Sequence, residues 1–195
     1  MRRREPIMTT LAIEQITIPY EKELLTKWKD RDPSIVPSFM LDWNGPGISN
    51  GYGFGEWMAE RHFRDKGFYT ITNEFNLLSK TSKFKMYNDI ISLMTSKQNL
   101  QKFKEAVKTL GDTNYSIENP DMFVYNLETC FFAEVKKEKD VLREPQIQFM
   151  YLAKSILGID SKLIYLSDPE NTDFQKLIEV KFDIPKGLEN TMNNC

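Results

Sequence analysis

The chain has few of the residues on which several common types of functional site depend. Cys130 and Cys195 are the only cysteines in 195 residues, too few for a disulfide framework. His62 is the only histidine, so histidine-based metal sites and Ser-His or Cys-His triads have little support. We therefore expect an intracellular, cytoplasmic protein whose function uses other side chains.

Long apolar runs and an excess of positive charge are also missing. Nowhere do about 18 apolar residues run together, as a membrane span requires. The start "MRRREPIMTTLAIEQ" lacks the apolar segment of a signal peptide, so we expect neither a membrane span nor secretion. The net charge of -2 means that any polyanionic partner has to be bound by a local patch. The arginines at residues 2–4 are expected to be a solvated start, with a phosphate-contacting arm as the alternative.

Hydrophobic residues make up 41% of the chain, enough to bury one core in one domain. Apolar spacing and breaks at Gly and Pro predict the elements. In order, they are a helix over residues 17–29, a helix over 54–66 that Gly67 ends, a strand from Phe68, two helices between 79 and 110, a hairpin of "DMFVYN" and "CFFAEVKKE", a helix over "EPQIQFMYLAKSILG", the strand "KLIYLS" and a last edge strand in "FQKLIEVKFDIP". This order predicts an α/β fold, a mixed sheet with helices on its faces.

The segment "GPGISNGYGFGE" ahead of the second helix is rich in glycine. Gly51, Gly53 and Gly55 suggest a phosphate-binding loop. No strand is predicted before them and no Lys-Ser or Lys-Thr pair follows. The sequence therefore favours an irregular turn.

Three charged residues interrupt the apolar pattern of the hairpin. Side chains alternate across a strand, so Glu134 and Lys136 share a face with Phe132, while Val135 lies on the other. If Asp121 begins the partner strand, its carboxylate lies beside Glu134, and the two repel unless a cation sits between them. Mg²⁺ suits such a pair because it takes one or two carboxylates, retains waters and accepts phosphate oxygens. The alternative is a solvated strand face with an ordinary Glu-Lys pair.

The pair Pro120-Asp121, followed by Glu134-Val135-Lys136, resembles the signature of the PD-(D/E)XK nuclease superfamily. Upstream, "GEWMAERHFRDKGF" resembles the first core helix of these nucleases. Glu56 stands at the position of the metal-binding glutamate of that helix, with Glu60 as a second candidate one turn later. A first-turn acid that complements the helix dipole is the other interpretation of Glu56.

Downstream, "EVKKEKDVLREPQIQF" resembles the VRR-NUC group, in which an aspartate, a leucine and a helix-opening glutamine follow the catalytic lysine. Asp140, Leu142 and Gln146 occupy these positions, and Glu118 stands where the group has a glycine. The resemblance implies that Gln146 binds substrate; the alternative is a polar residue at a helix start.

The resemblance implies a restriction-endonuclease-like core (αβββαβ) with a mixed central sheet flanked by helices, plus a helical insertion. The nuclease core is expected at residues 51–167, with the insertion at 79–112, after an N-terminal helix and irregular lead-in at 1–50 and before a C-terminal extension at 168–195. The implied catalytic residues are Asp121, Glu134 and Lys136, and the implied metal ligands are Glu56, Asp121, Glu134 and the carbonyl of Val135.

The function implied by the resemblance is that of a Mg²⁺-dependent deoxyribonuclease, with Mn²⁺ as a substitute, which hydrolyses DNA phosphodiester bonds by a metal-activated water. A catalytically inactive nucleic-acid-binding or assembly module with the same fold is the alternative. A plain helical interaction protein is a third possibility, disfavoured by the hairpin. The lysines of the insertion form either a surface that follows a nucleic-acid backbone or a solvated face. A homodimer is left open, since one site per chain would need a second copy to cut both strands together.

Overall fold

The computed structural model describes residues 6–42, 47–72, 75–78, 85–111, 116–137, 140–167, 169–170 and 175–185. The arginines at 2–4, the insertion lysines at 80 and 83 and the tail from residue 186 lie outside these ranges. The helices and strands are, in chain order, β1 (Pro6–Pro19), α1 (Lys22–Lys29), α2 (Ser38–Leu41), the 3-10 turn η1 (Ile48–Asn50), α3 (Phe54–Asp65), β2 (Tyr69–Thr72), α4 (Lys85–Met94), α5 (Lys97–Gly111), β3 (Met122–Tyr125), β4 (Cys130–Lys137), α6 (Glu144–Leu152), the π-helical turn η3 (Ala153–Leu157), β5 (Ser161–Ser167) and β6 (Gln175–Pro185).

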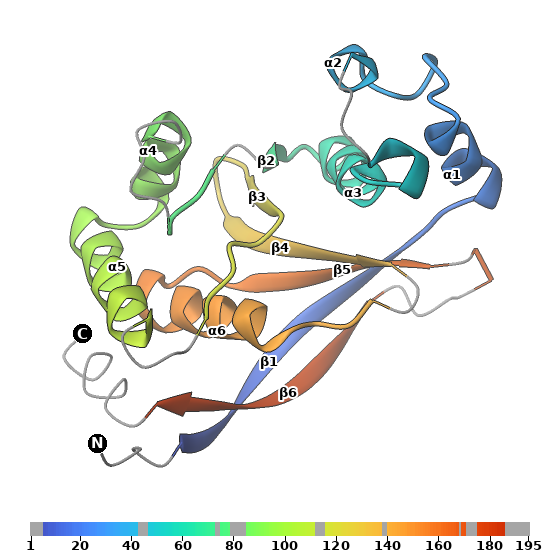
Figure 1. The fold of residues 1–195 in the computed structure, drawn as a ribbon. Helices are drawn as coiled ribbons and strands as arrows, with labels where there is room; N and C mark the ends of the chain where they lie inside the picture. The colour runs from blue at the N-terminus through green and yellow to red at the C-terminus, as the bar shows by residue number, and fades with distance from the viewer. Residues whose placement is uncertain are drawn as a thin grey trace.

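The described part of the chain forms one six-stranded mixed sheet in the order β2-β3-β4-β5-β1-β6 (Figure 1). β3 pairs antiparallel with both β2 and β4, whereas β5 pairs parallel with both β4 and β1. β6 pairs antiparallel with β1 along 11 residue pairs. The α/β fold with a mixed sheet is therefore confirmed.

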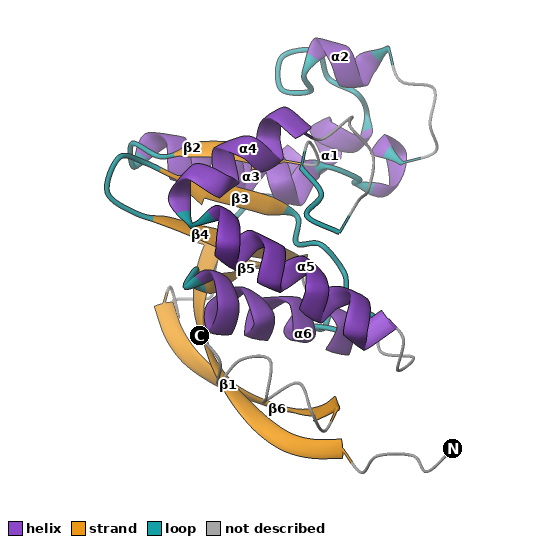
Figure 2. Cartoon of the chain, turned by 90° about the vertical axis from the view of Figure 1, so that its left-hand side faces the viewer, coloured by secondary structure: helices purple, strands orange, loops and turns teal. Residues whose placement is uncertain are grey.

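Helices cover both faces of this sheet (Figures 1 and 2). On one face, α1 and α3 pack through Trp28, Phe54 and Phe63 against alternate residues of β3, β4 and β5. On the other, α5 and α6 pack through Phe103 and Phe149 against the intervening residues. The two buried clusters place the central strand β4 between two apolar layers, so any polar group on it is shielded from water.

Most elements predicted from the sequence are confirmed. The helix over 54–66 is α3, and Gly67, with φ of 81°, follows its end as a glycine in the left-handed region does. The two insertion helices, the hairpin, the strand "KLIYLS" and the final edge strand are present as α4, α5, β3, β4, β5 and β6.

The N-terminal segment was predicted wrongly. The helix expected from Thr17 begins at Lys22, because Thr17–Pro19 belong to the strand β1. The residues Leu11, Ile13, Gln15 and Thr17 are buried at alternate positions, the period of a strand. β1 and β6 thus come from the flanking segments and complete one sheet with the strands between them.

No helix in the described ranges is both long enough and apolar enough to cross a membrane.

Candidate active site

A cleft of about 500 Å³ opens where the start of α3, the end of β4 and the start of α6 meet. Glu56, Asp121, Glu134, Lys136 and Gln146 all line it. Residues from three separate parts of the sequence therefore converge on one cavity, and of the side chains proposed for chemistry only Glu60, the second candidate on α3, is not among them. The backbone of Val135 lies between Glu134 and Lys136, and Val135 also lines the cleft.

Strand register brings Asp121 and Glu134 together. Met122 pairs with Ala133 across the hairpin, so Asp121 stands one position beyond, beside Glu134. The carboxylate of Asp121 is fixed there because its Oδ2 accepts a hydrogen bond of 2.8 Å from the backbone N–H of Val135. The predicted cross-strand approach of two carboxylates is confirmed.

Glu134 is held on one side only. Its Oε1 accepts hydrogen bonds from the ammonium of Lys136, at 2.8 Å, and from the side-chain amide of Gln146. Its Oε2 is buried and has no hydrogen-bond donor among the described residues. One oxygen of this carboxylate is therefore fully engaged, while the other accepts no hydrogen bond. The two carboxyl groups are close enough for a side-chain hydrogen bond when Glu134 is protonated.

Gln146 is engaged at both ends of its amide. While its Nε2 donates to Glu134, its Oε1 accepts from the backbone N–H of Arg143 at 2.9 Å, which also caps the start of α6. Its side chain is buried. In this arrangement Gln146 orients Glu134, whereas its predicted contact with substrate stays a prediction.

Burial dominates the electrostatics of the three acids. It is the main cause, ahead of the charge of Asp121, that raises the pKa of Glu134 to about 8. Burial likewise raises the pKa of Asp121 and of Glu56. Each group loses the hydration of its charged form, and one lysine cannot compensate three acids. Without a cation in the cleft, burial therefore disfavours the charged form of each of the three acids.

Glu56 reaches the cleft because α3 lies unusually close to β4. A Cβ atom at Gly55 would be only 2.9 Å from Cγ1 of Val135, so a glycine is needed where the helix crosses the strand. The charge of Asp121 contributes to the raised pKa of Glu56, which puts the two groups within electrostatic reach. Glu60, the second candidate, lines a different cavity and does not reach this cleft.

The residues fit a divalent cation of the hard, oxygen-binding type. In the described ranges, no three acidic, histidine or cysteine side chains are grouped tightly enough to form a metal centre by themselves. Mg²⁺ needs only one or two carboxylates because it retains several waters. The pair of Asp121 and Glu134, with the unpartnered Oε2 between them, meets that requirement, whereas Glu56 as a direct ligand stays a prediction.

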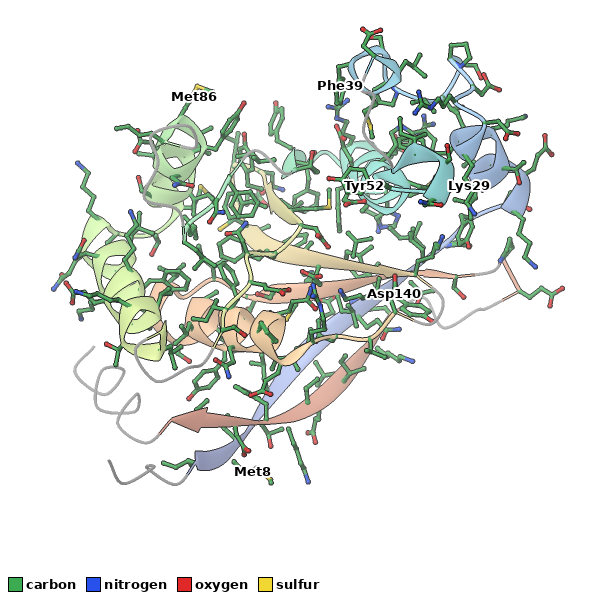
Figure 3. The ribbon with its side chains drawn as sticks, in the orientation of Figure 1. Met8, Lys29, Phe39, Tyr52, Met86 and Asp140 are labelled. Carbon is green, nitrogen blue, oxygen red and sulfur yellow. The ribbon has the colours of Figure 1, made fainter. Side chains whose placement is uncertain are left out.

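The positive groups at the cleft mouth were not predicted from the sequence, whereas the irregular turn over the glycine-rich run was. Lys137 and Arg143 line the cleft, and Arg143 forms an ion pair of 2.6 Å with Glu118. Gly51, with φ of 85°, makes a turn beside the side chains of Lys29 and Lys137. Figure 3 labels Lys29 and Tyr52 in the region of α1 and α3, and Asp140 below them. Tyr52 and Asp140 line the cleft. The glycine-rich run was the available signal.

The two remaining reactive side chains lie outside the cleft. His62 was expected on the surface of its helix, but it is half-buried against Phe63. Its Nε2 has no hydrogen-bond partner in the described part of the chain. Burial lowers the pKa of His62. Cys130 packs beside the core, as predicted, and burial raises the pKa of its thiol.

Comparison with protein-family models, with curated proteins and with solved structures gave no match.

Proposed function

We propose that the protein is a Mg²⁺-dependent nuclease that hydrolyses phosphodiester bonds of DNA in the cleft between α3, β4 and α6. The observation that carries the proposal is the buried, unpartnered Oε2 of Glu134 beside the carboxylate of Asp121. A buried carboxyl oxygen without a donor destabilises the fold, and apolar residues of similar volume would be more stable there. A cation bound by the two carboxylates would compensate for this destabilisation and would explain why the two acids are buried together.

The order of elements supports the same conclusion. α3, β2, β3, β4, α6 and β5 follow one another in the αβββαβ order that the resemblance to PD-(D/E)XK nucleases implies, with α4 and α5 inserted between β2 and β3. In this proposal they form the restriction-endonuclease-like core. β1 and β6 extend that core at the edge beyond β5.

Each cleft residue has a definable task. Bound between Asp121 and Glu134, Mg²⁺ would supply Lewis-acid polarisation of a phosphate and a lowered pKa of water. Lys136 holds a positive charge 2.8 Å from Glu134, where it stabilises negative charge that develops on the phosphate. Gln146 fixes Oε1 of Glu134 and thereby aims Oε2 at the cleft.

Positive side chains at the cleft mouth provide the local patch that a protein of net charge -2 needs for DNA. Lys29 and Lys137 flank the Gly51 turn, and Arg143 lies at the start of α6. Their position around the acids lets phosphates approach a site that would otherwise repel them.

Cleavage of labelled linear, single-stranded, flapped and four-way-junction DNA with Mg²⁺ or Mn²⁺ tests the proposal. Glu134→Gln and Lys136→Met are expected to lower the rate by about 10²-fold or more. The matched controls are Glu23→Gln and Lys27→Met, a Glu-Lys pair with a similar N–O distance, 2.9 Å, on the exposed face of α1. Equal cutting by wild type and Glu134→Gln would overturn the proposal.

The inactive-module alternative has one observation in its favour, because Glu118 neutralises Arg143 at the cleft. DNA binding without cutting in either metal would support that alternative. Stabilisation by Mg²⁺ that is lost in Asp121→Ala separates both from a plain interaction protein. At a metal concentration 100 times the Kd, mass action adds about 2.7 kcal/mol to the free energy of unfolding.

A further inference from the structure

A second cavity opens beside the cleft and plays no part in the proposed chemistry. Its volume is about 360 Å³, and its walls come from α1, α2 and α3. The rings of Trp28, Phe39, Tyr52 and Trp57 line it. We call this cavity the aromatic pocket.

The back of the aromatic pocket is rigid, whereas its mouth is exposed. Trp28 is fully buried, its Nε1 donates to the carbonyl oxygen of Tyr52 at 2.9 Å, and its ring lies 5.2 Å from that of Trp57. By contrast, Phe39 is 76% exposed and Tyr52 is 49% exposed. Figure 3 labels both residues in the region of α1, α2 and α3. Large flat rings that stand at the entrance of a fixed cavity are suited to stack on a planar ligand.

The polar groups of the aromatic pocket exclude a phosphate. Its lining includes the carboxylates of Glu56 and Glu60, and no lysine or arginine among the described residues. Glu60 is held in place by an ion pair of 2.6 Å with Arg64. A carboxylate repels anions and accepts hydrogen bonds from N–H groups. The occupant is therefore planar and apolar on its faces, with N–H donors at its edge.

The aromatic pocket and the cleft are adjacent and share part of their walls. Tyr52, Gly53 and Glu56 line both cavities. A nucleotide whose phosphate lies in the cleft therefore has its base within reach of the pocket. Adenine, guanine and cytosine all carry exocyclic N–H donors that a carboxylate can accept.

We infer that the aromatic pocket binds one unstacked base of the DNA substrate, next to the phosphate that lies in the cleft. The inference rests on the proposed nuclease function and specifies its substrate. A base that is paired inside a duplex cannot enter a concave pocket without leaving its stack, which costs free energy. Single strands, flaps and frayed ends are consequently the preferred substrates over the interior of a blunt duplex.

The test uses single-stranded oligonucleotides, each with one abasic nucleotide at successive positions, and the full chain. Binding is measured with Ca²⁺ and cleavage with Mg²⁺. In wild type, one abasic position next to the cut site is expected to weaken binding about tenfold, as loss of one base–aromatic stack does. Phe39→Ala should bind intact DNA about tenfold more weakly and should lose sensitivity to the abasic position. Tyr69→Ala is the matched control, since Tyr69 is an aromatic residue 65% exposed on β2, and it should retain that sensitivity.

The two proposals fail in different ways. If cleavage persists, and if neither an abasic position nor the Phe39→Ala substitution alters binding, the base pocket alone is overturned. Absence of both DNA binding and cleavage would overturn the nuclease function as well. Quenching of tryptophan fluorescence by tetramethylammonium but by no nucleoside would also overturn the inference, because it would assign the pocket to a cation.

Discussion

Two Glu-Lys pairs in this molecule have nearly the same N–O distance, yet the pKa of the glutamate shifts in opposite directions. Lys27 Nζ lies 2.9 Å from Glu23 Oε1 on α1, and Lys136 Nζ lies 2.8 Å from Glu134 Oε1 on β4. The side chain of Glu23 is 78% exposed, that of Glu134 only 2%. The hydrogen bond from Lys27 lowers the pKa of Glu23, whereas burial raises that of Glu134 to about 8 despite Lys136.

The difference shows that burial, not the distance between the charges, decides what a pair does. In water each charge keeps most of its hydration, so an exposed pair stabilises little and costs little. In the interior, the free energy of the lost hydration exceeds that of the attraction, and the pair destabilises the fold. A buried pair that opens onto a cleft is therefore best explained by what it binds.

The largest effect is expected when the buried pair is removed altogether. The double variant Glu134→Gln/Lys136→Met should lose cleavage by about 10²-fold or more. Without metal it should be at least as stable as wild type, because side chains that do not ionise replace two buried ionisable groups that lose hydration on folding. Cleavage assays and denaturant unfolding in EDTA measure the two quantities. A double variant that unfolds markedly more easily than wild type would show that the pair is structural.

A tenfold to hundredfold effect is expected from the residue that orients Glu134. Gln146→Leu removes the amide that holds Oε1 in place, and such outer partners of metal ligands typically contribute about 10- to 100-fold in metal affinity. The Mg²⁺ concentration for half-maximal cleavage should rise, with the rate partly recovered at saturating Mg²⁺. Gln101→Leu is the control, because Gln101 donates to Glu105 on the exposed face of α5. A loss of rate that no Mg²⁺ concentration restores would contradict a positioning role.

The pH dependence of stability should differ between the two pairs. The folded-state pKa of Glu134, about 8, lies above its ordinary value of 4.5, so the folded protein keeps this proton when the unfolded chain has released it. The contribution of Glu134 to the free energy of unfolding without metal therefore falls as pH rises from about 4.5 to 8. Thermal unfolding of wild type and Glu134→Gln across this range should show that the variant becomes more stable relative to wild type as pH rises. A constant difference between them would argue against a protonated Glu134.

The smallest effect belongs to the exposed pair. Glu23→Gln and Lys27→Met should leave the cleavage rate unchanged and the melting temperature within experimental error, since both side chains stay hydrated with or without the partner. Differential scanning calorimetry of wild type and the two variants measures the melting temperatures. A clear drop in melting temperature would mean that burial is not what separates the two pairs.

The cleft could largely be predicted from sequence, because its residues obey local rules. Strand alternation fixed the shared face of Glu134 and Lys136, and a short hairpin fixed the position of Asp121. β1 was missed although it alternates, because its pairing with β5 depends on residues almost the whole chain away. Glu60 was left open as a ligand; helix periodicity places it one turn from Glu56, but only the packing of α1 and α2 on α3 shows that it lines another cavity.

The position of β1 also determines when the sheet can be completed. β1 lies between β5 and β6, and its partners are residues 162–167 and 175–185. During synthesis, β1 leaves the ribosome well before the segments with which it pairs. Its apolar residues Leu11 and Ile13 have no sheet to join until then, whereas the β3–β4 hairpin can form at once from neighbouring residues. Closure of the sheet around β1 is therefore a late and slow event, and a nascent chain stalled before residue 162 carries an unpaired strand open to aggregation and chaperone binding.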